Sequence, residues 1–328
     1  MEFRTLVKFE KALFSFSYST SILLTGSCFA ENIGEKLESA FFSVDANPFG
    51  TVYNPASVAF GLRLLLGKKH FEATDLFYHA GAFHSFHHHS RFSASTSEAC
   101  LQKINDRMLA SAETLRKADR LIVTWGTSWV YVWNNNGQIV TNCHKLPEAE
   151  FTRKRLSVAE IVTDWNMLLT DLLRDNPSLK ILFTVSPIRH WKDGAHGNQL
   201  SKATLLLAVD ELRRNYPDTV DYFPAYELMM DELRDYRFYA DDMLHPSSLA
   251  VDYIWKRFSE HYLISEAKTL MAELQELEKA VRHRPFQPEG EAYRAFLKRT
   301  LEKAERLYPR VGSRKLLIMI DELRNKIS

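Results

Sequence analysis

Three side chains of this sequence, Ser27, Asp242 and His245, are of the types that carry out nucleophilic acyl transfer. Ser27 follows an apolar run, residues 22–24, and precedes a segment whose apolar residues recur at helical spacing. At the amino end of a helix, a hydroxyl can attack an ester while unpaired N–H groups and the helix dipole stabilise the oxyanion. Helix capping is the alternative role for Ser27, and the local pattern alone favours it.

Asp242 and His245 have a spacing that suits a catalytic pair. On a tight loop or helical turn, the carboxylate can accept a hydrogen bond from one imidazole nitrogen while the other nitrogen faces Ser27. The spacing alone is weak evidence, because Asp193 and His196 share it. We favour the later pair because the proline and serine that follow it open a helix, which would fix His245 just before the helical start. A capping aspartate and a surface histidine are the alternative.

These residues lie within a series of motifs that resembles the GSCFA family, part of the SGNH (GDSL-like) hydrolase superfamily. The motifs are Gly-Ser-Cys-Phe-Ala (26–30), Asn-Pro-Phe-Gly-Thr-Val-Tyr-Asn-Pro (47–55), Gly-Thr-Ser-Trp-Val-Tyr (126–131), Asn-Cys-His-Lys (142–145), Ser-Pro-Ile-Arg-His (186–190) and Asp-Met-Leu-His-Pro-Ser (242–247). The resemblance extends over about residues 20–262, and the motifs are specific as a set.

The resemblance implies a serine ester hydrolase without a cofactor or metal. Ser27 would form an acyl intermediate, His245 would act as general base and then as general acid, and Asp242 would orient the imidazole. Water is the simplest second acceptor. The substrate would be a small-molecule or carbohydrate acyl ester, including an O-acetyl ester, and the sequence does not choose among these.

The resemblance also implies an oxyanion hole, formed by the N–H groups of Ser27 and Gly50. A glycine needed only for its backbone conformation is the alternative for Gly50. The superfamily takes a third donor from a Gly-x-Asn block, but this chain has Gly-Thr-Ser at residues 126–128 and no asparagine there. The candidates for the third donor, among which the sequence does not decide, are Thr127, Ser128 and Asn142.

The elements that must position these residues are buried strands. Apolar runs of strand length occupy residues 22–24, 121–126, 180–185 and 220–223. Because ligands bind at the carboxyl ends of parallel strands, Arg189 and His190 are also placed at the catalytic edge. Arg189 could hold a carboxylate or a sugar hydroxyl, or it could brace a loop through a salt bridge.

Helical patterns alternate with these strands. They cover residues 29–41, a segment starting at Pro55, 98–117, 157–176, 201–215 and a segment starting at 246–247. The alternation predicts an α/β fold, and the resemblance implies a three-layer α/β/α sandwich with a mainly parallel sheet.

Beyond residue 262 the pattern changes to charged, Leu- and Ala-rich helices at 266–282 and 291–306, and to an apolar run at 316–323. A proline-containing linker, residues 283–288, separates the first two. We therefore predict a catalytic domain at 1–262 and a helical extension at 263–328. The extension would pack on the main domain or form a homodimer contact.

Residues 70–95 are rich in histidine and phenylalanine. Such a cluster suggests a metal site, but adjacent histidines on an extended chain point to opposite faces, and a site needs three or four converging ligands. We therefore favour a substrate lid or buried packing over a metal site.

The composition excludes several classes of protein. The net charge is +1, which gives no reason to expect nucleic acid or an anionic membrane as a partner. Three cysteines without CxxC spacing predict free thiols and a reducing compartment. No run approaches the ~20 apolar residues of a membrane span, and residues 1–20 lack the apolar core of a secretory signal, so we expect a cytoplasmic protein.

Two other functions fit the same sequence. In one, Cys28 is the nucleophile, because a helix amino terminus can lower the pKa of a thiol. In the other, the chain retains the fold as a non-catalytic binding module and uses the 70–95 segment and the carboxyl-terminal helices for a partner.

Overall fold

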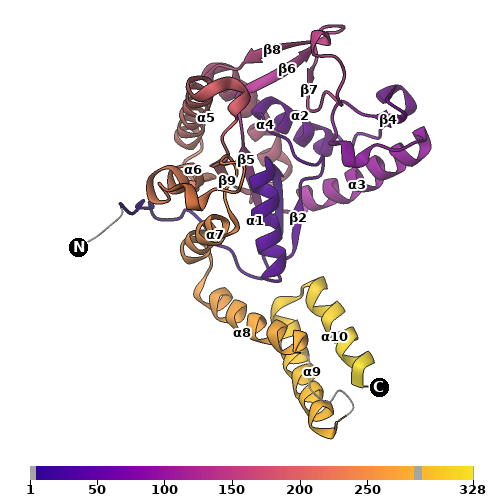
Figure 1. Cartoon of the computed structure of the whole chain (residues 1–328), viewed down its shortest axis with the longest axis vertical. Coiled ribbons are helices and arrows are strands. Elements are labelled where there is room, and N and C mark those ends of the chain that lie inside the picture. The colour runs from indigo at the N-terminus through magenta and orange to yellow at the C-terminus, as the bar shows by residue number, and fades with distance from the viewer. Residues whose placement is uncertain (1–4, 284–289, 328) are drawn as a thin grey trace.

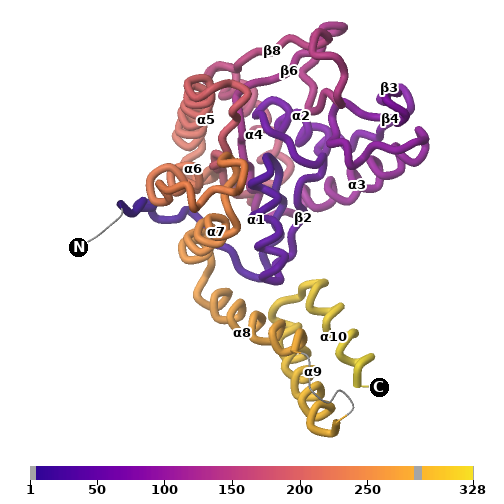
Figure 2. Tube along the Cα trace, viewed as in Figure 1, coloured from indigo at the N-terminus to yellow at the C-terminus, as the bar shows by residue number. Residues whose placement is uncertain are grey.

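The computed structural model describes residues 5–283 and 290–327, and it is built around a five-stranded parallel sheet (Figures 1 and 2). The strand order is β10-β9-β5-β1-β2. The bounds are β1 (Ile22–Gly26), β2 (Val44–Ala46), β5 (Arg120–Trp125), β9 (Lys180–Val185) and β10 (Val220–Tyr222). The α/β class and the parallel sheet are confirmed.

Side chains alternate between the two faces of this sheet. Leu23, Leu121 and Phe183 belong to one hydrophobic core, whereas Leu24 and Leu182 belong to the other. Both faces of a parallel sheet must be covered by helices, which explains why these strands are apolar throughout. The result is the predicted three-layer sandwich.

The first core is covered by α2 (Pro55–Leu66), α3 (Ser97–Lys117), α4 (Val158–Asp175) and α5 (Gly194–Asn215). The second core is covered by α1 (Cys28–Ser39), α6 (Ala225–Glu227) and α7 (Ser248–Tyr262). α5 begins earlier than the predicted Ser201, because Gly194 and Gly197 are part of the helix and not of a preceding loop.

The strand order reverses between β1 and β5. The chain passes from β1 outward to β2 on one side, and later strands continue from β5 on the other side. In open α/β sheets, ligands bind at such a switch point, outside the carboxyl ends of the strands. Ser27 directly follows β1 and Gly126 directly follows β5, so the topology places both at this edge.

Two small antiparallel sheets lie outside the central one. β6 (Trp129–Trp133) pairs with β7 (Ile139–Val140) and with β8 (Phe151–Arg155), and β3 (Phe77–His79) pairs with β4 (Ala82–His84). Figure 1 shows β6 and β8 side by side beyond the top of the sandwich. β6 starts soon after β5 ends, so this sheet forms a wall above the switch point.

The chain ends in three helices, α8 (Ser265–Arg282), α9 (Glu291–Val311) and α10 (Arg314–Ile327), which project from the sandwich (Figure 1). Most of the predicted linker at 283–288 lies outside the described residues. Lys315 Nζ donates to the carbonyl oxygen of Ser39 at 2.9 Å and so joins α10 to the main body. The boundary at 262/263 remains a prediction.

The amino-terminal segment is tied to the end of α7. Phe16 forms a parallel bridge with Leu263, and its N–H donates to the carbonyl oxygen of Tyr262 at 2.9 Å. Phe16 is fully buried, and it shares a core with Leu270 and Leu274 of α8. The start of the chain, α7 and α8 therefore pack as one unit.

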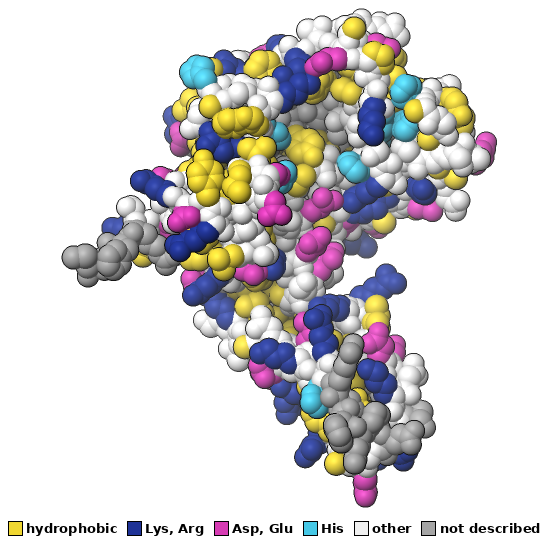
Figure 3. All heavy atoms as spheres, in the orientation of Figure 1, with side chains coloured by type: hydrophobic (Ala, Val, Ile, Leu, Met, Phe, Trp, Pro, Cys, Tyr) yellow, Lys and Arg dark blue, Asp and Glu magenta, His cyan; other side chains and the backbone are white. Residues whose placement is uncertain are grey.

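Positive and negative side chains are interspersed over the face shown in Figure 3, including the carboxyl-terminal helices. No helix within residues 5–283 and 290–327 is long and apolar enough to cross a bilayer. The three cysteines are free thiols, as predicted.

Candidate active site

Ser27 sits in the turn between β1 and α1. It is almost completely buried, and its Oγ accepts a hydrogen bond from the N–H of Phe29 at 3.3 Å, which caps the helix. The preceding residue must be glycine, because Gly26 has φ +140° and a Cβ there would lie 2.1 Å from the carbonyl oxygen of Thr124. The capping role is therefore real, and it leaves the hydroxyl proton of Ser27 available.

The 47–55 motif joins the ends of β1 and β5. Asn47 Oδ1 accepts from the N–H of Gly26 at 2.9 Å. The carbonyl oxygen of Tyr53 accepts from the N–H groups of Gly126 and Thr127 at 2.7 and 3.0 Å. The motif thus holds in place the two backbone turns that flank the switch point.

The two N–H groups predicted to bind the oxyanion are already occupied. Ser27 N–H donates to the carbonyl oxygen of Thr124 at 3.0 Å, and Gly50 N–H donates to that of Asn47 at 2.9 Å. Gly50 has φ +78°, and a Cβ there would lie 2.3 Å from Cβ of His89. Gly50 is therefore a turn glycine required by its backbone conformation and by close packing, which is the alternative role predicted for it from the sequence.

Asp242 and His245 form the predicted pair. His245 Nδ1 lies 2.5 Å from Asp242 Oδ2, and Asp242 Oδ1 accepts from the N–H groups of Leu244 and His245, each at 2.9 Å. These backbone hydrogen bonds, followed by the one from His245, lower the pKa of Asp242 to about 2. Ser247 caps α7 by accepting from the N–H of Ala250, so the imidazole is fixed just before a helix.

Ser27 and His245 line the same cavity, which has a volume of about 370 Å³ and is called here the Ser27 cavity. No hydrogen bond joins their side chains in the described part of the chain: Asp242 holds Nδ1 of the imidazole, and Oγ of Ser27 accepts from the N–H of Phe29. The other lining residues are Cys28, Tyr53, Asn54, Thr127, Trp129, Tyr131, Val140, Thr141, Arg153, Ser186, Ile188, Arg189, His190, Trp191, Lys192 and Asp193.

His190 lies next to Ser27. A Cβ built on Gly126 would lie 3.1 Å from His190 Nε2 and 3.3 Å from Cβ of Ser27, so both groups adjoin the same point. Nε2 is buried and has no hydrogen-bond partner among the described residues. Burial lowers the pKa of His190 to about 3, with the charge of Lys202 adding to the effect. A neutral imidazole, whose Nε2 has no partner among the described residues, therefore lies next to Ser27.

The structure separates the three candidates for the third oxyanion donor. Thr127 lines the cavity, and its Oγ1 lies 3.0 Å from Oγ of Ser201. Ser128 is fully buried, with Oγ donating to Ser201, and it does not line the cavity. Asn142 also lies outside the lining, and its Oδ1 accepts from the N–H of His144. Of the three candidates, Thr127 is the one that lines the cavity, and the identity of the third donor stays a prediction.

Asn54 is a polar residue of the lining that the sequence did not single out. Its Oδ1 caps α2 by accepting from the N–H of Ser57 at 2.8 Å, and its Nδ2 donates to Oγ of the same serine at 3.1 Å. An amide nitrogen carries two protons, so one remains for the cavity. The first residue of α1, Cys28, also keeps an N–H that the helix does not use.

A buried lysine lies behind the site. Lys202 of α5 is fully buried, and its Nζ donates to the carbonyl oxygens of Gly126 and Ser186, both at 2.7 Å. These carbonyls follow the carboxyl ends of β5 and β9. Burial lowers the pKa of Lys202 to about 7, with Arg189 as a further cause. Two N–H donors of the amine therefore meet these two carbonyl acceptors.

The second Asp-His pair of the sequence does not form. Asp193 has a buried side chain that pairs with Arg153, whose guanidinium carbon lies 4.8 Å from the ring centre of Trp129. His196 is exposed on α5 and does not line the cavity. Asp193 and Arg153 instead build the cavity wall next to the small sheet.

The histidine- and phenylalanine-rich segment contributes none of the residues that line the Ser27 cavity. It packs behind the cavity wall, because the carbonyl oxygen of Phe86 accepts from the N–H of Thr141, which is a lining residue. Its role as a lid stays a prediction. Buried packing, the other predicted role, is found: Phe86 stacks on Phe77 and joins a core with Val140 and Phe151. Within residues 5–283 and 290–327, no three His, Cys, Asp or Glu side chains converge as metal ligands.

The GSCFA family model matches residues 21–258, and a second model, described as the C-terminal domain of GSCFA domain proteins, matches residues 274–327. The first match covers more than half of the chain and includes Ser27, Asp242 and His245. No curated protein matches the chain.

Solved structures that resemble the chain are distant. A carbohydrate esterase family 3 protein from Talaromyces cellulolyticus shares 11% identity with a TM-score of 0.35, covering 77% of this chain and 99% of the other. An acetyl xylan esterase from Butyrivibrio proteoclasticus shares 12% identity with a TM-score of 0.36, covering 79% of this chain and 64% of the other. A Streptococcus pneumonia protein, provisionally titled a platelet activating factor, shares 12% identity with a TM-score of 0.37, covering 73% and 83%.

Proposed function

The chain belongs to the GSCFA family, and we propose that it is a serine ester hydrolase of SGNH type that acts through an acyl-Ser27 intermediate. One observation carries the proposal. Ser27 and His245 line one cavity at the carboxyl edge of the sheet, and a carboxylate holds Nδ1 of that imidazole at 2.5 Å. A hydroxyl, an imidazole and a carboxylate in this relation are the parts of an acyl-transfer site.

In the first step, His245 Nε2 takes the hydroxyl proton as Oγ of Ser27 attacks the carbonyl carbon, and Asp242 stabilises the imidazolium. His245 then gives this proton to the oxygen of the leaving alcohol. Water repeats the sequence on the acyl-serine and releases the acid. Ser27 has no hydrogen bond to His245 in the described structure, so this step requires the half-exposed imidazole to move toward the serine.

The oxyanion formed by this attack needs donors that are not already used. The N–H of Cys28 and the second amide proton of Asn54 meet this condition, and Nε2 of the neutral His190 is a further candidate. Thr127 remains in the set, since it lines the cavity. These donors replace the N–H groups of Ser27 and Gly50, whose hydrogen bonds are made within the fold.

A fluorophosphonate probe tests the proposal directly, because it forms a stable adduct with an activated serine. We expect one adduct, mapped by mass spectrometry to Ser27, together with hydrolysis of p-nitrophenyl acetate. Both should vanish in Ser27→Ala. A folded protein that takes no adduct and hydrolyses no ester would instead be a binding module.

Cys28 is the alternative nucleophile, because it lines the same cavity with Sγ 3.4 Å from the hydroxyl of Tyr53. Cys28→Ser separates the two proposals. If Ser27 is the nucleophile, this variant keeps its turnover and its adduct. If Cys28 is the nucleophile, turnover disappears in Cys28→Ser and persists in Ser27→Ala.

The location of the protein in the cell is inferred from its cysteine content and not from the proposed chemistry. Free thiols at Cys28, Cys100 and Cys143 suit a reducing compartment, so we propose a cytoplasmic enzyme. We also keep the homodimer through the carboxyl-terminal helices as a proposal, which rests on the sequence pattern of these helices.

A further inference from the structure

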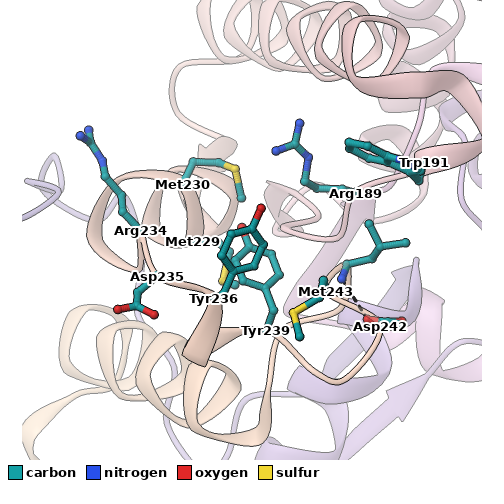
Figure 4. A pocket seen from close by; sticks show the side chains of 11 residues that line it. Arg189, Trp191, Met229, Met230, Arg234, Asp235, Tyr236, Tyr239, Asp242 and Met243 are labelled. Atoms are coloured by element: carbon teal, nitrogen blue, oxygen red, sulfur yellow. Dashed lines mark hydrogen bonds between the residues drawn. The ribbon is translucent and has the colours of Figure 1, made fainter.

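A second cavity, of about 510 Å³, adjoins the Ser27 cavity, and we call it the Arg189 cavity (Figure 4). Arg189 and Trp191 line both cavities, so the two spaces share a wall. Asp242 lines the Arg189 cavity, whereas its partner His245 lines the Ser27 cavity. The rest of the lining comes from residues 229–244.

The direction of acyl transfer assigns each cavity to one half of an ester. His245 must reach the oxygen of the leaving alcohol to protonate it, so the alcohol portion lies on the His245 side of Ser27. The loop that carries His245 also borders the Arg189 cavity through Asp242. The alcohol portion therefore extends into the Arg189 cavity, and the acyl group stays in the Ser27 cavity.

One of the charged groups that line this second cavity, Arg189, has no ion-pair partner among the described residues, and the lining also includes Arg234, Asp235 and Asp242. Arg189 forms no ion pair or hydrogen bond with residues 5–283 or 290–327, and its Nε is buried without a partner. Its guanidinium carbon lies 5.6 Å from the ring centre of Trp191. Arg234, on the same cavity, pairs with Asp231 at 3.0 Å. A partly buried guanidinium is stabilised by an anion that accepts two hydrogen bonds, as a carboxylate does.

Aromatic surface and polar groups complete the lining. Tyr236 is 72% exposed and Trp191 is 53% exposed, so both offer ring faces to a ligand. Figure 4 shows the Tyr236 ring in the middle of the lining, between Met230 and Met243, with Arg189 beyond it. Asp235 adds a carboxylate acceptor. A sugar ring matches such a lining, because its C–H face packs on aromatic rings while its hydroxyls bind polar groups.

We propose that the Arg189 cavity binds the alcohol portion of the ester, and that this portion is an anionic sugar. Its carboxylate pairs with Arg189, and its ring packs on Tyr236 and Trp191. The assignment to the alcohol portion rests on the proposed function. Recognition of an anionic sugar does not, since it requires no turnover.

Binding to the Ser27→Ala protein tests recognition without chemistry. The probes are methyl β-D-glucuronoside and methyl β-D-glucoside, which differ in one carboxylate, titrated and followed by Trp fluorescence and by protein NMR. We expect the glucuronoside to bind at least ~10-fold more tightly, because a bidentate carboxylate–arginine pair is charge-assisted. A second substitution, Arg189→Gln, should remove this preference. Equal binding of the two probes, or a preference that survives in Arg189→Gln, overturns the proposal.

Arg214→Gln is the matched control, because Arg214 lies on the exposed surface of α5, paired with Asp210. It should keep the preference in full. Arg189→Lys retains the charge without the planar fork, and we expect it to keep part of the preference. Near-ultraviolet circular dichroism checks that each variant is folded, and a loss of binding is compared with the wild-type result only for variants that are folded.

Turnover separates this proposal from the proposed function. Acetyl esters of the same two glycosides are compared by kcat/KM, and Arg189→Gln should lower the glucuronoside-to-glucoside ratio at least ~10-fold. If neither ester is hydrolysed but the glucuronoside still binds selectively, the anionic-sugar site stands and the esterase proposal fails. If both esters are hydrolysed equally well by wild-type protein, the esterase proposal stands and this inference fails.

Discussion

Two regions of this molecule hold their histidines in opposite ways. His245 is half exposed, borders a cavity, and has Nδ1 fixed by Asp242. His88 and His144 are buried among aromatic rings and His87 is half-buried beside them, and burial lowers the pKa of each to between about 3 and about 4. The first arrangement keeps a base accessible, and the second keeps neutral imidazoles as packing groups.

The difference arises from the backbone around each histidine. At residues 242–245 a turn directs two N–H groups at Asp242, which therefore stays ionised beside the imidazole. In the 70–95 segment, Ser85 is the partner instead: its Oγ lies 3.0 Å from Nδ1 of His88, and its carbonyl oxygen lies 2.8 Å from Nε2 of His144. A local abundance of histidines is therefore a poorer guide to chemistry than one histidine beside a carboxylate at the edge of a sheet.

Replacing one buried serine in each region gives the largest expected contrast. Ser27→Ala should lower turnover of p-nitrophenyl acetate by at least ~10³-fold, because no nucleophile remains. Ser85→Ala should leave turnover within about threefold but lower the free energy of unfolding by ~1–2 kcal/mol, because His88 loses a buried partner. Urea unfolding and steady-state kinetics measure the two effects. A comparable loss of turnover in Ser85→Ala would contradict the separation of the two regions.

Asp242→Asn tests the carboxylate that distinguishes His245. The amide keeps the shape of the side chain but cannot stabilise the imidazolium, so kcat should fall by ~10³- to 10⁴-fold. The matched control is His196→Ala, which breaks the second Asp-His spacing on an exposed surface and should leave kcat unchanged. If kcat falls less than tenfold in Asp242→Asn, His245 acts as a base without help from the carboxylate, and the distinction between the two regions is wrong.

Acidification should destabilise the protein through the buried histidines. Each has a pKa below the ordinary 6.5, so between pH 6.5 and about pH 4 the unfolded chain binds protons that the native chain excludes. The free energy of unfolding therefore falls as the pH drops, by up to ~1.4 kcal/mol per pH unit for each histidine. His88→Phe should make this fall less steep in urea titrations. If the free energy of unfolding falls with decreasing pH as steeply in His88→Phe as in the wild-type protein, His88 is not held neutral in the native state.

Lys202 extends the comparison to the region of the active site, in a different pH window. Its native pKa of about 7 lies below the ordinary 10.5, so the unfolded chain binds the extra proton between these values. The free energy of unfolding should therefore rise from pH 7 to 9, by ~1 kcal/mol per unit from this group. Lys202→Met removes that rise, whatever its absolute stability. If the free energy of unfolding rises with pH equally steeply in the wild-type protein and in Lys202→Met, the lysine is protonated in the native protein.

Local pattern was enough to predict much of this molecule. β9 has its predicted bounds, and α3 and α4 begin and end within a residue of theirs. The Asp242–His245 contact was also predictable, because three residues on one turn fix it. Periodicity and short spacing are properties of a single segment, and for that reason a sequence reveals them.

The features that escaped prediction depend on contacts between distant segments. Gly50 belongs to a turn packed on His89, which no pattern in either segment indicates. Lys202 reaches carbonyl groups 76 and 16 residues away in the chain, and its place in a helical pattern resembles that of an ordinary surface lysine. The unpaired state of Arg189 likewise requires knowledge of every neighbour. Its two predicted roles, ligand binding and a bracing salt bridge, are distinguished only by the fold, in which it makes no salt bridge with the described residues.

The bridge between Phe16 and Leu263 has a practical consequence for anyone who trims this protein for study. Deleting the first sixteen residues, or ending the gene at residue 262, would remove one side of the same bridge and loosen the far end of α7. The near end of that helix begins just after His245. Shortening either terminus would therefore disturb the position of His245 through α7, although both cuts lie outside the Ser27 cavity.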